Sequence, residues 1–156
     1  MYDGIGRYTA MMTIAECLTI DLPEHDWRAI DLPHGFALVR SPDYDACGGN
    51  IEQASFIVSI AVLRDRQPGS SIDALMRRRV PQGRPEESAV IVAGAAATRF
   101  EYFDGVRQIH SYFVRCPSGV TVEITLATFL HPTGQPKVEL ERAAPDVFSR
   151  LEWAAR

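Results

Sequence analysis

Between residues 98 and 129, four polar residues lie within two neighbouring predicted strands, namely Arg99, Glu101, Gln108 and His110. Aromatic and β-branched residues surround them, which is typical of strands. An arginine can clamp an anion, and a histidine can donate or accept a hydrogen bond near neutral pH. These four residues predict a small polar ligand site if the fold gathers them on one face of a sheet. The alternative is a group of ordinary cross-strand ion pairs at the wet end of that sheet.

Two turns decide which of these residues meet. Asp104-Gly105 is the pattern of a two-residue type I′ hairpin loop, and PSG at 117–119 indicates a three-residue turn. The cross-strand pairs expected from these loops are Arg99–His110, Glu101–Gln108, His110–Leu126, Tyr112–Ile124 and Val114–Val122. The four polar residues then lie at one end of a face that also carries Val106, Tyr112, Val114, Val122, Ile124 and Leu126. The opposite face carries Phe100, Tyr102, Ile109 and Phe113, together with Arg115 and Glu123.

A protein partner has two other candidate contacts. Arg77 and Arg78 lie in the last turn of a helix expected between Ser70 and Pro81, where they could dock an acidic partner or simply oppose the helix dipole. Trp27 follows the first predicted strand, and it fits either an exposed contact or a buried indole. All three are candidate partner-binding residues.

The other residue types that could do chemistry do not form a set. Cys116 and His110 lie six residues apart on one predicted strand, which is roughly 20 Å and beyond hydrogen-bond reach. The histidines share no i, i+4 spacing, and no phosphate-binding glycine loop occurs. The sequence therefore predicts no catalytic residues, no metal and no cofactor. A hydrolase or transferase site assembled from distant loops, with residues such as His25, Asp26 or His131, stays open.

The composition narrows the class of protein. With 156 residues and a net charge of −4, the chain fits one domain that has neither nucleic acid nor an anionic membrane as a partner. The cysteines are scattered, and no stretch approaches the ~20 apolar residues of a membrane span, so a cytoplasmic location is expected. We expect residues 1–16 to be an N-terminal extension, possible start codons being Met1, Met11 and Met12. Residues 17–156 are expected to form a single domain.

Six or so strands and at least two amphipathic helices are expected to position these residues. The strands are predicted at 17–22, 35–41, 54–65, 88–103 with a bend at Gly94, 106–116 and 120–129. The helices are predicted from Ser70 to Val80 and from Pro145 onward, and the composition of residues 43–50 indicates a loop. Short turns require antiparallel strands, and amphipathic helices need a sheet face to cover. The predicted fold is α+β, an α/β/α sandwich with a central antiparallel sheet flanked by helices.

The order of these elements resembles a known family. A strand ending in LP is closely followed by a tryptophan in LTIDLPEHDW, and a helix opens with PGSSIDAL. A step of small residues, VAGAAATRFEY, leads into a long β-meander, and a helix with the sequence DVFSRLEWA closes the chain. Over residues 17–155 this pattern is similar to the PsbP-like superfamily, especially its LpqN-type and DcrB-like actinobacterial members. The resemblance implies an α/β/α sandwich and a binding, adaptor or assembly role rather than a shared enzyme activity.

The sequence thus favours a non-enzymatic binding, adaptor or chaperone-like module that contacts a protein partner or a second copy of itself. The first alternative is a carrier of a small amphipathic ligand, lodged between sheet and helix with Arg99 and His110 at its mouth. The second alternative is the hydrolase or transferase with a loop-assembled site.

Overall fold

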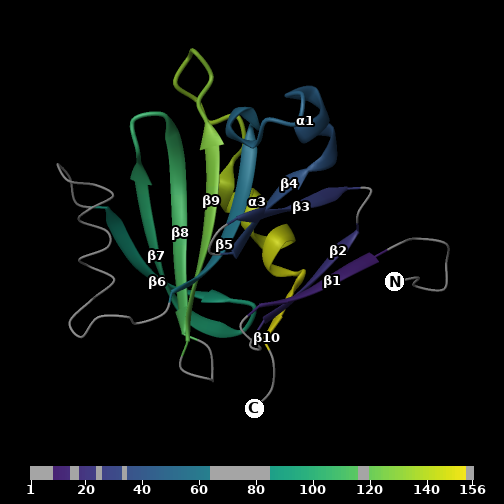
Figure 1. Cartoon of the computed structure of the whole chain (residues 1–156). Helices are drawn as coiled ribbons and strands as arrows, with labels where there is room; N and C mark the ends of the chain where they lie inside the picture. The colour runs from purple at the N-terminus through teal and green to yellow at the C-terminus, as the bar shows by residue number, and fades with distance from the viewer. Residues whose placement is uncertain are drawn as a thin grey trace.

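The computed structural model describes residues 9–14, 18–23, 26–32, 35–63, 85–115 and 120–153, which form two antiparallel sheets (Figure 1). The large sheet has seven strands in the spatial order β3-β4-β5-β9-β8-β7-β6. Their bounds are Trp27–Leu32 (β3), Gly35–Arg40 (β4), Phe56–Leu63 (β5), Glu86–Val92 (β6), Ala95–Phe103 (β7), Arg107–Arg115 (β8) and Thr121–Phe129 (β9). The small sheet has the order β1-β2-β10, with bounds Thr9–Ile14, Leu18–Pro23 and Leu151–Trp153. The helical elements of this part of the chain are α1 (Ser41–Ala46), the 3-10 turn η1 (Ile51–Gln53) and α3 (Leu140–Phe148).

The centre of the large sheet is built from its most apolar strands. β5 has the sequence FIVSIAVL and pairs with β4 on one side and with β9 on the other. At the far edge, β6 and β7 are joined by Ala93 and Gly94, whose φ angles are 48° and 83°. Positive φ at both central residues is what a type I′ hairpin requires, and glycine adopts it without strain. The predicted bend at Gly94 is confirmed.

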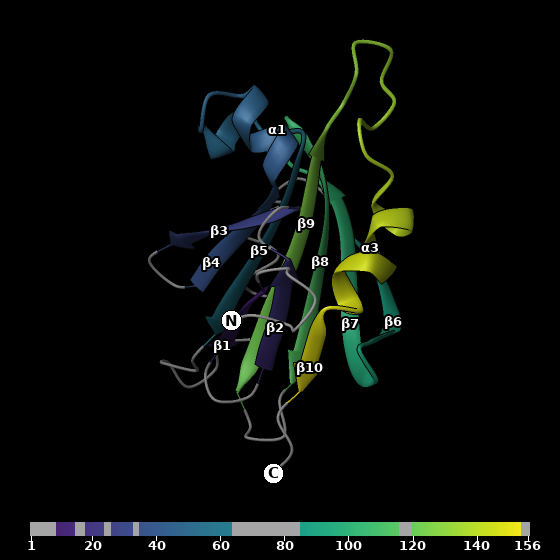
Figure 2. The same ribbon diagram turned by 90° about the vertical axis from the view of Figure 1, so that its right-hand side faces the viewer.

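One face of the large sheet is covered by α3 and by the small sheet, and we call it the helix face. Figure 2 shows α3 and β10 running along this side. The inward stripe of α3 consists of Leu140, Ala143, Ala144 and Val147. On β2, Leu18, Ile20 and Leu22 are at most 1% exposed. These residues share one core with the large sheet, and burial of this apolar surface is the main stabilising term of the fold.

The opposite side of the large sheet is called the cleft face here. α1 and η1 cover one end of it, where Tyr44, Cys47 and Ile51 pack against strands β4 and β5. Beyond that end lies a second apolar cluster, formed by Phe100, Tyr102, Ile109, Phe113 and Ala127. The predicted division of the apolar residues between two faces is therefore confirmed for Tyr112, Val114, Val122, Ile124 and Leu126 on one side and for Phe100, Tyr102, Ile109 and Phe113 on the other.

The predicted α/β/α sandwich is wrong. The described residues are mostly β, and a second antiparallel sheet takes part of the place that helices were expected to fill. Its strands include Thr9–Ile14, which lies inside the expected N-terminal extension and pairs with β2. Its third strand, Leu151–Trp153, comes from the end of the predicted C-terminal helix. The helix expected between Ser70 and Val80, with Arg77 and Arg78, lies outside the described residues.

Local signals explain two further corrections. α3 begins at Leu140 rather than at Pro145, because the buried stripe of the helix starts there and Pro145 is accommodated inside the helix. Residues 43–46, expected as part of a loop, belong to α1. Pro42 occupies the first turn of α1, where a missing N–H is not needed, and Gly48 follows the helix with a φ of 68°.

Candidate functional site

The turn between β7 and β8 sets the geometry of the predicted polar site. Its central residues are Gly105 and Val106, not Asp104 and Gly105. The backbone N–H of Asp104 donates to the carbonyl of Arg107 (3.1 Å), and the Asp104 carboxylate accepts the N–H groups of Val106 (2.9 Å) and Arg107 (2.6 Å). Gly105 has a φ of 97°, which suits glycine at the first central position of a type II′ turn. Asp104 therefore precedes the two central residues of the turn instead of being one of them. The pairing of β7 with β8 is shifted accordingly from the predicted one.

This shift changes which polar residues face each other. Glu101 faces His110 and Arg99 faces Tyr112, so the predicted pairs Arg99–His110 and Glu101–Gln108 are wrong. Gln108 instead lies opposite Phe103. The next hairpin has the register that was predicted, with the pairs His110–Leu126, Tyr112–Ile124 and Val114–Val122.

Three of the four predicted residues are engaged in polar pairs. His110 Nε2 lies 3.1 Å from Glu101 Oε1 across the β7–β8 pair. Arg99 Nε donates to Ser88 Oγ at 3.2 Å, and its guanidinium lies 3.8 Å from the carboxylate of Glu141 on α3. The structure therefore joins Arg99 to α3 and His110 to Glu101, as two separate pairs.

These pairs do not line a cleft. His110 is only 3% exposed, and its Nδ1 has no hydrogen-bond partner among the described residues. Burial raises the pKa of the Tyr112 hydroxyl above its ordinary value of 10.0, although Arg99 beside it acts in the opposite direction. Tyr112 is therefore protonated at neutral pH. Neither of the two clefts described below includes Arg99, Glu101, Gln108 or His110 in its lining.

A cleft with a volume of about 550 Å³ lies on the cleft face. Its walls come from strands β3, β4, β5, β7, β8 and β9 and from the β7–β8 turn. Small-molecule sites in proteins commonly have volumes of roughly 300–1,000 Å³. The size of this cleft is therefore suited to a small ligand.

The hollow has a simple cause in the sequence. On the cleft face, β4 and β5 contribute the small residues Gly35, Ser59 and Ala61, and Gly35 lies opposite Ala61 in the register. Larger side chains stand on the other side of these residues, including Tyr102 and Ile109. The cleft is thus a floor of small residues beside a wall of large ones.

Three hydroxyl groups form a chain beside this floor. Tyr102 Oη lies 3.4 Å from Ser111 Oγ, which in turn lies 3.4 Å from Thr125 Oγ1. Tyr102 and Thr125 line the cleft, while Ser111 is fully buried behind them. Each hydroxyl can donate one hydrogen bond and accept two, so two contacts within the chain leave further donor and acceptor capacity.

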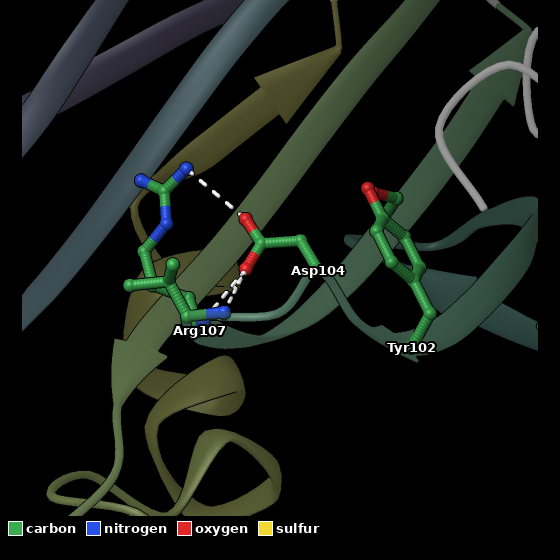
Figure 3. A network of polar contacts seen from close by, with 5 residues as sticks. Tyr102, Asp104 and Arg107 are labelled. Atoms are coloured by element: carbon green, nitrogen blue, oxygen red, sulfur yellow. Dashed lines mark hydrogen bonds and ion pairs between the residues drawn. The ribbon is translucent and has the colours of Figure 1, made fainter. Parts of the chain in front are cut away.

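The rim beside Tyr102 is fixed by an ion pair. Figure 3 shows the Asp104 carboxylate turned toward Arg107, whose guanidinium nitrogen lies 3.3 Å from it. Partial burial by itself would raise the pKa of Asp104. The two backbone N–H groups that donate to the carboxylate and the nearby Arg107 charge outweigh this effect, and they lower the pKa below its ordinary value of 3.8. Asp104 is therefore ionised and paired at neutral pH.

At the floor of the cleft, Glu123 adds a buried carboxyl group. It is 4% exposed, and it lies between Ala61 on β5 and Phe113 on β8 in the register. Glu123 also has an interaction partner of its own. The polar groups of the lining are thus the hydroxyls of Tyr102, Thr125 and Ser59, the Asp104–Arg107 pair and the buried Glu123.

A second cleft, of about 330 Å³, lies over Trp27. Trp27 itself is 3% exposed, and the guanidinium carbons of Arg40 and Arg150 lie 5.4 Å and 5.9 Å from its ring centroid. Both arginines also pair loosely with Asp146, at 4.0 Å and 3.5 Å. Trp27 is therefore mainly a core residue, and the charges around it already balance one another.

The hollow on the cleft face was not predicted from the sequence. The available signal was the alternation of small residues in two neighbouring strands, Gly35 and Ala37 in GFALV and Ser59 and Ala61 in SIAV. Of the loop residues considered as a catalytic set, His131 is exposed after β9, Asp26 lines the Trp27 cleft, and His25 lies outside the described residues.

In the described part of the chain, no group of three or more His, Cys, Asp or Glu side chains is placed to hold a metal ion. No described helix is long and apolar enough to span a membrane.

Comparisons with known proteins give distant structural likenesses. No family model and no curated protein shows a significant match to this sequence. A crystal structure from Bacteroides thetaiotaomicron matches with a TM-score of 0.48 and 12% identity, over 89% of this chain and 46% of that one. A Pseudomonas aeruginosa protein of unknown function, named as a candidate regulator, matches with a TM-score of 0.41 and 14% identity, over 96% of this chain and 99% of that one. This chain spans about half the length of the Bacteroides protein, and at these TM-scores neither likeness carries an argument.

Proposed function

We propose that this protein is a binding module for a small, largely apolar molecule, which it holds in the cleft on the cleft face. The observation that carries the proposal is the 550 Å³ hollow between Gly35, Ser59 and Ala61 on one side and Tyr102 on the other. An apolar hollow with a few convergent polar groups is the usual form of a ligand site. This function is close to the carrier that the sequence offered as an alternative, but its site is on the other face of the sheet.

An adaptor that binds a protein or a second copy of itself stays a prediction. The feature that favours it is β6, the last strand of the large sheet, whose Ile91 is 67% exposed. An edge strand can pair with a strand from another chain. However, Glu86 and Glu87 begin the same strand, and charged residues on an edge are typical of strands that avoid such pairing. Small-molecule binding is therefore the favoured function.

Ligand binding is tested with a variant in which a larger side chain fills the cleft. Ala61 is half-buried on the cleft floor, so Ala61→Leu adds three carbon atoms to the hollow. We expect the unmodified protein to bind the uncharged fluorescent probe N-phenyl-1-naphthylamine saturably. Ala61→Leu should weaken this binding about tenfold or more, because the new side chain occupies the ligand volume.

The matched control is Ala89→Leu, the same change at an exposed position of β6. It should bind the probe as the unmodified protein does, and thermal melting should show both variants folded. Native mass spectrometry of protein purified gently from its host gives a second measurement, since a retained ligand adds mass. Probe binding by Ala61→Leu that equals that of Ala89→Leu would rule out the proposed site.

A further inference from the structure

We infer that the cleft takes an elongated ligand whose head group is uncharged and forms hydrogen bonds, such as an alcohol or a primary amide on an apolar chain. This inference rests on the proposed function and adds the chemical class of the ligand.

The charges around the cleft argue against an anionic head group. Among the described residues that line the cleft, Arg107 is the one cationic side chain, and it already pairs with Asp104 at 3.3 Å. The carboxyl group of Glu123 is buried in the floor. A carboxylate or phosphate placed there would lose its water and find no unpaired cation among the described lining residues, which is strongly unfavourable.

A cationic head group is also disfavoured. The Asp104 carboxylate already accepts two backbone N–H groups and contacts the Arg107 guanidinium. Glu123 has its own interaction partner, so an ammonium group would have to compete for both carboxylates. Burying such a group without an available counter-charge is costly.

An uncharged head group finds what it needs in the hydroxyl chain. Tyr102 and Thr125 face the cleft, and Ser111 links them from behind. The three hydroxyls can rotate, so the chain can donate to a ligand carbonyl or accept from a ligand hydroxyl or amide. This adaptable, neutral set of partners matches a polar group that carries no charge.

The shape of the cleft supports an extended ligand with a defined direction. From Tyr102 on β7 to Gly35 on β4, the lining crosses β8, β9 and β5, which is four strand spacings or about 19 Å. The hydroxyl chain runs from Tyr102 on β7 to Thr125 on β9, and Ser59 lies opposite Thr125 on β5, whereas the exposed Leu32 lies at the β3 end. The head group is therefore placed at the hydroxyl chain, and the apolar chain of the ligand extends beyond β5 toward Leu32.

A series of ten-carbon ligands that differ in their head group tests this assignment. The experiment measures competition with N-phenyl-1-naphthylamine for the unmodified protein, at neutral pH and below the aggregation limit of each ligand. The competing ligands are decan-1-ol, decanamide, decanoate and decylamine. We expect the alcohol and the amide to displace the probe at concentrations about tenfold or more below those of the two ions. Thr125→Val should weaken decanamide binding about fivefold, because it removes one hydroxyl at nearly constant volume. It should leave decanoate unchanged.

The matched control is Thr121→Val, which makes the same change on the same face of β9 but outside the lining. It should leave all four ligands unchanged. If decanoate or decylamine competes best and Ala61→Leu abolishes that competition, the cleft binds a ligand but the inference about the head group is wrong. If no decyl compound displaces the probe and Ala61→Leu has no effect on probe binding, the inference and the proposed function both fail.

Discussion

At the level of single side chains, Asp104 does more than the type I′ pattern suggested. Its carboxylate accepts two backbone N–H groups and pairs with Arg107, so one side chain fixes the turn, the register of β7 against β8 and the rim of the cleft. A one-residue change in loop position exchanges the partners of Arg99 and Glu101, because register determines every cross-strand contact.

The Asp104 carboxylate makes stability depend on pH in the acid range. Since folding lowers its pKa, its stabilising contribution is complete above the ordinary value of 3.8 and is lost as the pH falls through the lowered value. We expect Asp104→Ala to reduce the free energy of unfolding by about 1.5 kcal/mol at pH 7, through the lost hydrogen bonds. The difference from the unmodified protein should shrink below about pH 4.

Urea unfolding at pH 7 and at pH 3 measures this difference. Asp31→Ala, at an exposed position of β3, controls for removal of a negative charge as such. An Asp104→Ala deficit that stays equally large at pH 3 would contradict the assigned role of the carboxylate.

Among the strands, β4 and β5 approach each other so closely that only glycine fits at position 35. A Cβ atom on Gly35 would meet the carbonyl oxygen of Ile60 on β5, and backbone cannot move away cheaply. We expect Gly35→Ala to reduce the free energy of unfolding by about 3 kcal/mol, as overpacking against a fixed neighbour does.

Gly94→Ala provides the comparison for this prediction. Gly94 has a positive φ but open space around it, so alanine there should reduce stability by only about 1 kcal/mol. Chemical denaturation of both variants gives the two values. A Gly35→Ala protein as stable as Gly94→Ala would mean that the two strands can separate without loss.

Hydrophobic alternation explains which elements the sequence could predict. It was sufficient for β2, β4, β5 and the β8–β9 register, because residues such as Val122, Ile124 and Leu126 can face only one side of the sheet. It was insufficient at the C-terminus, where Val147, Phe148 and Leu151 fit a helical stripe although Leu151 lies in a strand. Leu151 lies in a strand because residues 151–153 pair with β2, some 130 residues away in the sequence. A local sequence pattern carries no information about such a distant pairing.

The candidate site was predicted less well than the fold elements. The sequence pointed to Arg99, Glu101 and His110 because ionisable residues are conspicuous among aromatic and β-branched ones. The cleft instead depends on what is small, namely Gly35, Ser59 and Ala61, and on their alignment across two strands. A hollow is a property of packed neighbours, so it becomes visible only when the pairing of strands is known.

Across the whole molecule, the continuous core and the proposed binding cleft lie on opposite sides of one sheet. The helix face holds the continuous core under α3 and β2, while the cleft face keeps a hollow. We expect Leu126→Ala, at 0% exposure on the helix face, to reduce the free energy of unfolding by about 2–5 kcal/mol. Its affinity for N-phenyl-1-naphthylamine at low temperature should stay unchanged.

Thr125→Val, one residue away on the other side of the same strand, should show the reverse behaviour. Its unfolding free energy should change by about 1 kcal/mol or less, while decanamide binding weakens. Equilibrium denaturation and probe competition on both variants measure the two effects. Equal loss of affinity in the two variants would show that the faces are not independent.

The pairing of β10 with β2 has a consequence for the protein during its synthesis. The Thr19 hydroxyl donates to the carbonyl of Glu152, 133 residues further along the chain. Leu18, Ile20 and Leu22 therefore leave the ribosome long before their last neighbouring strand does. At ~5–20 residues per second, that interval is on the order of 10 s. We expect the nascent chain to engage a holding chaperone during this time, because these three apolar side chains stay exposed until β10 has been translated.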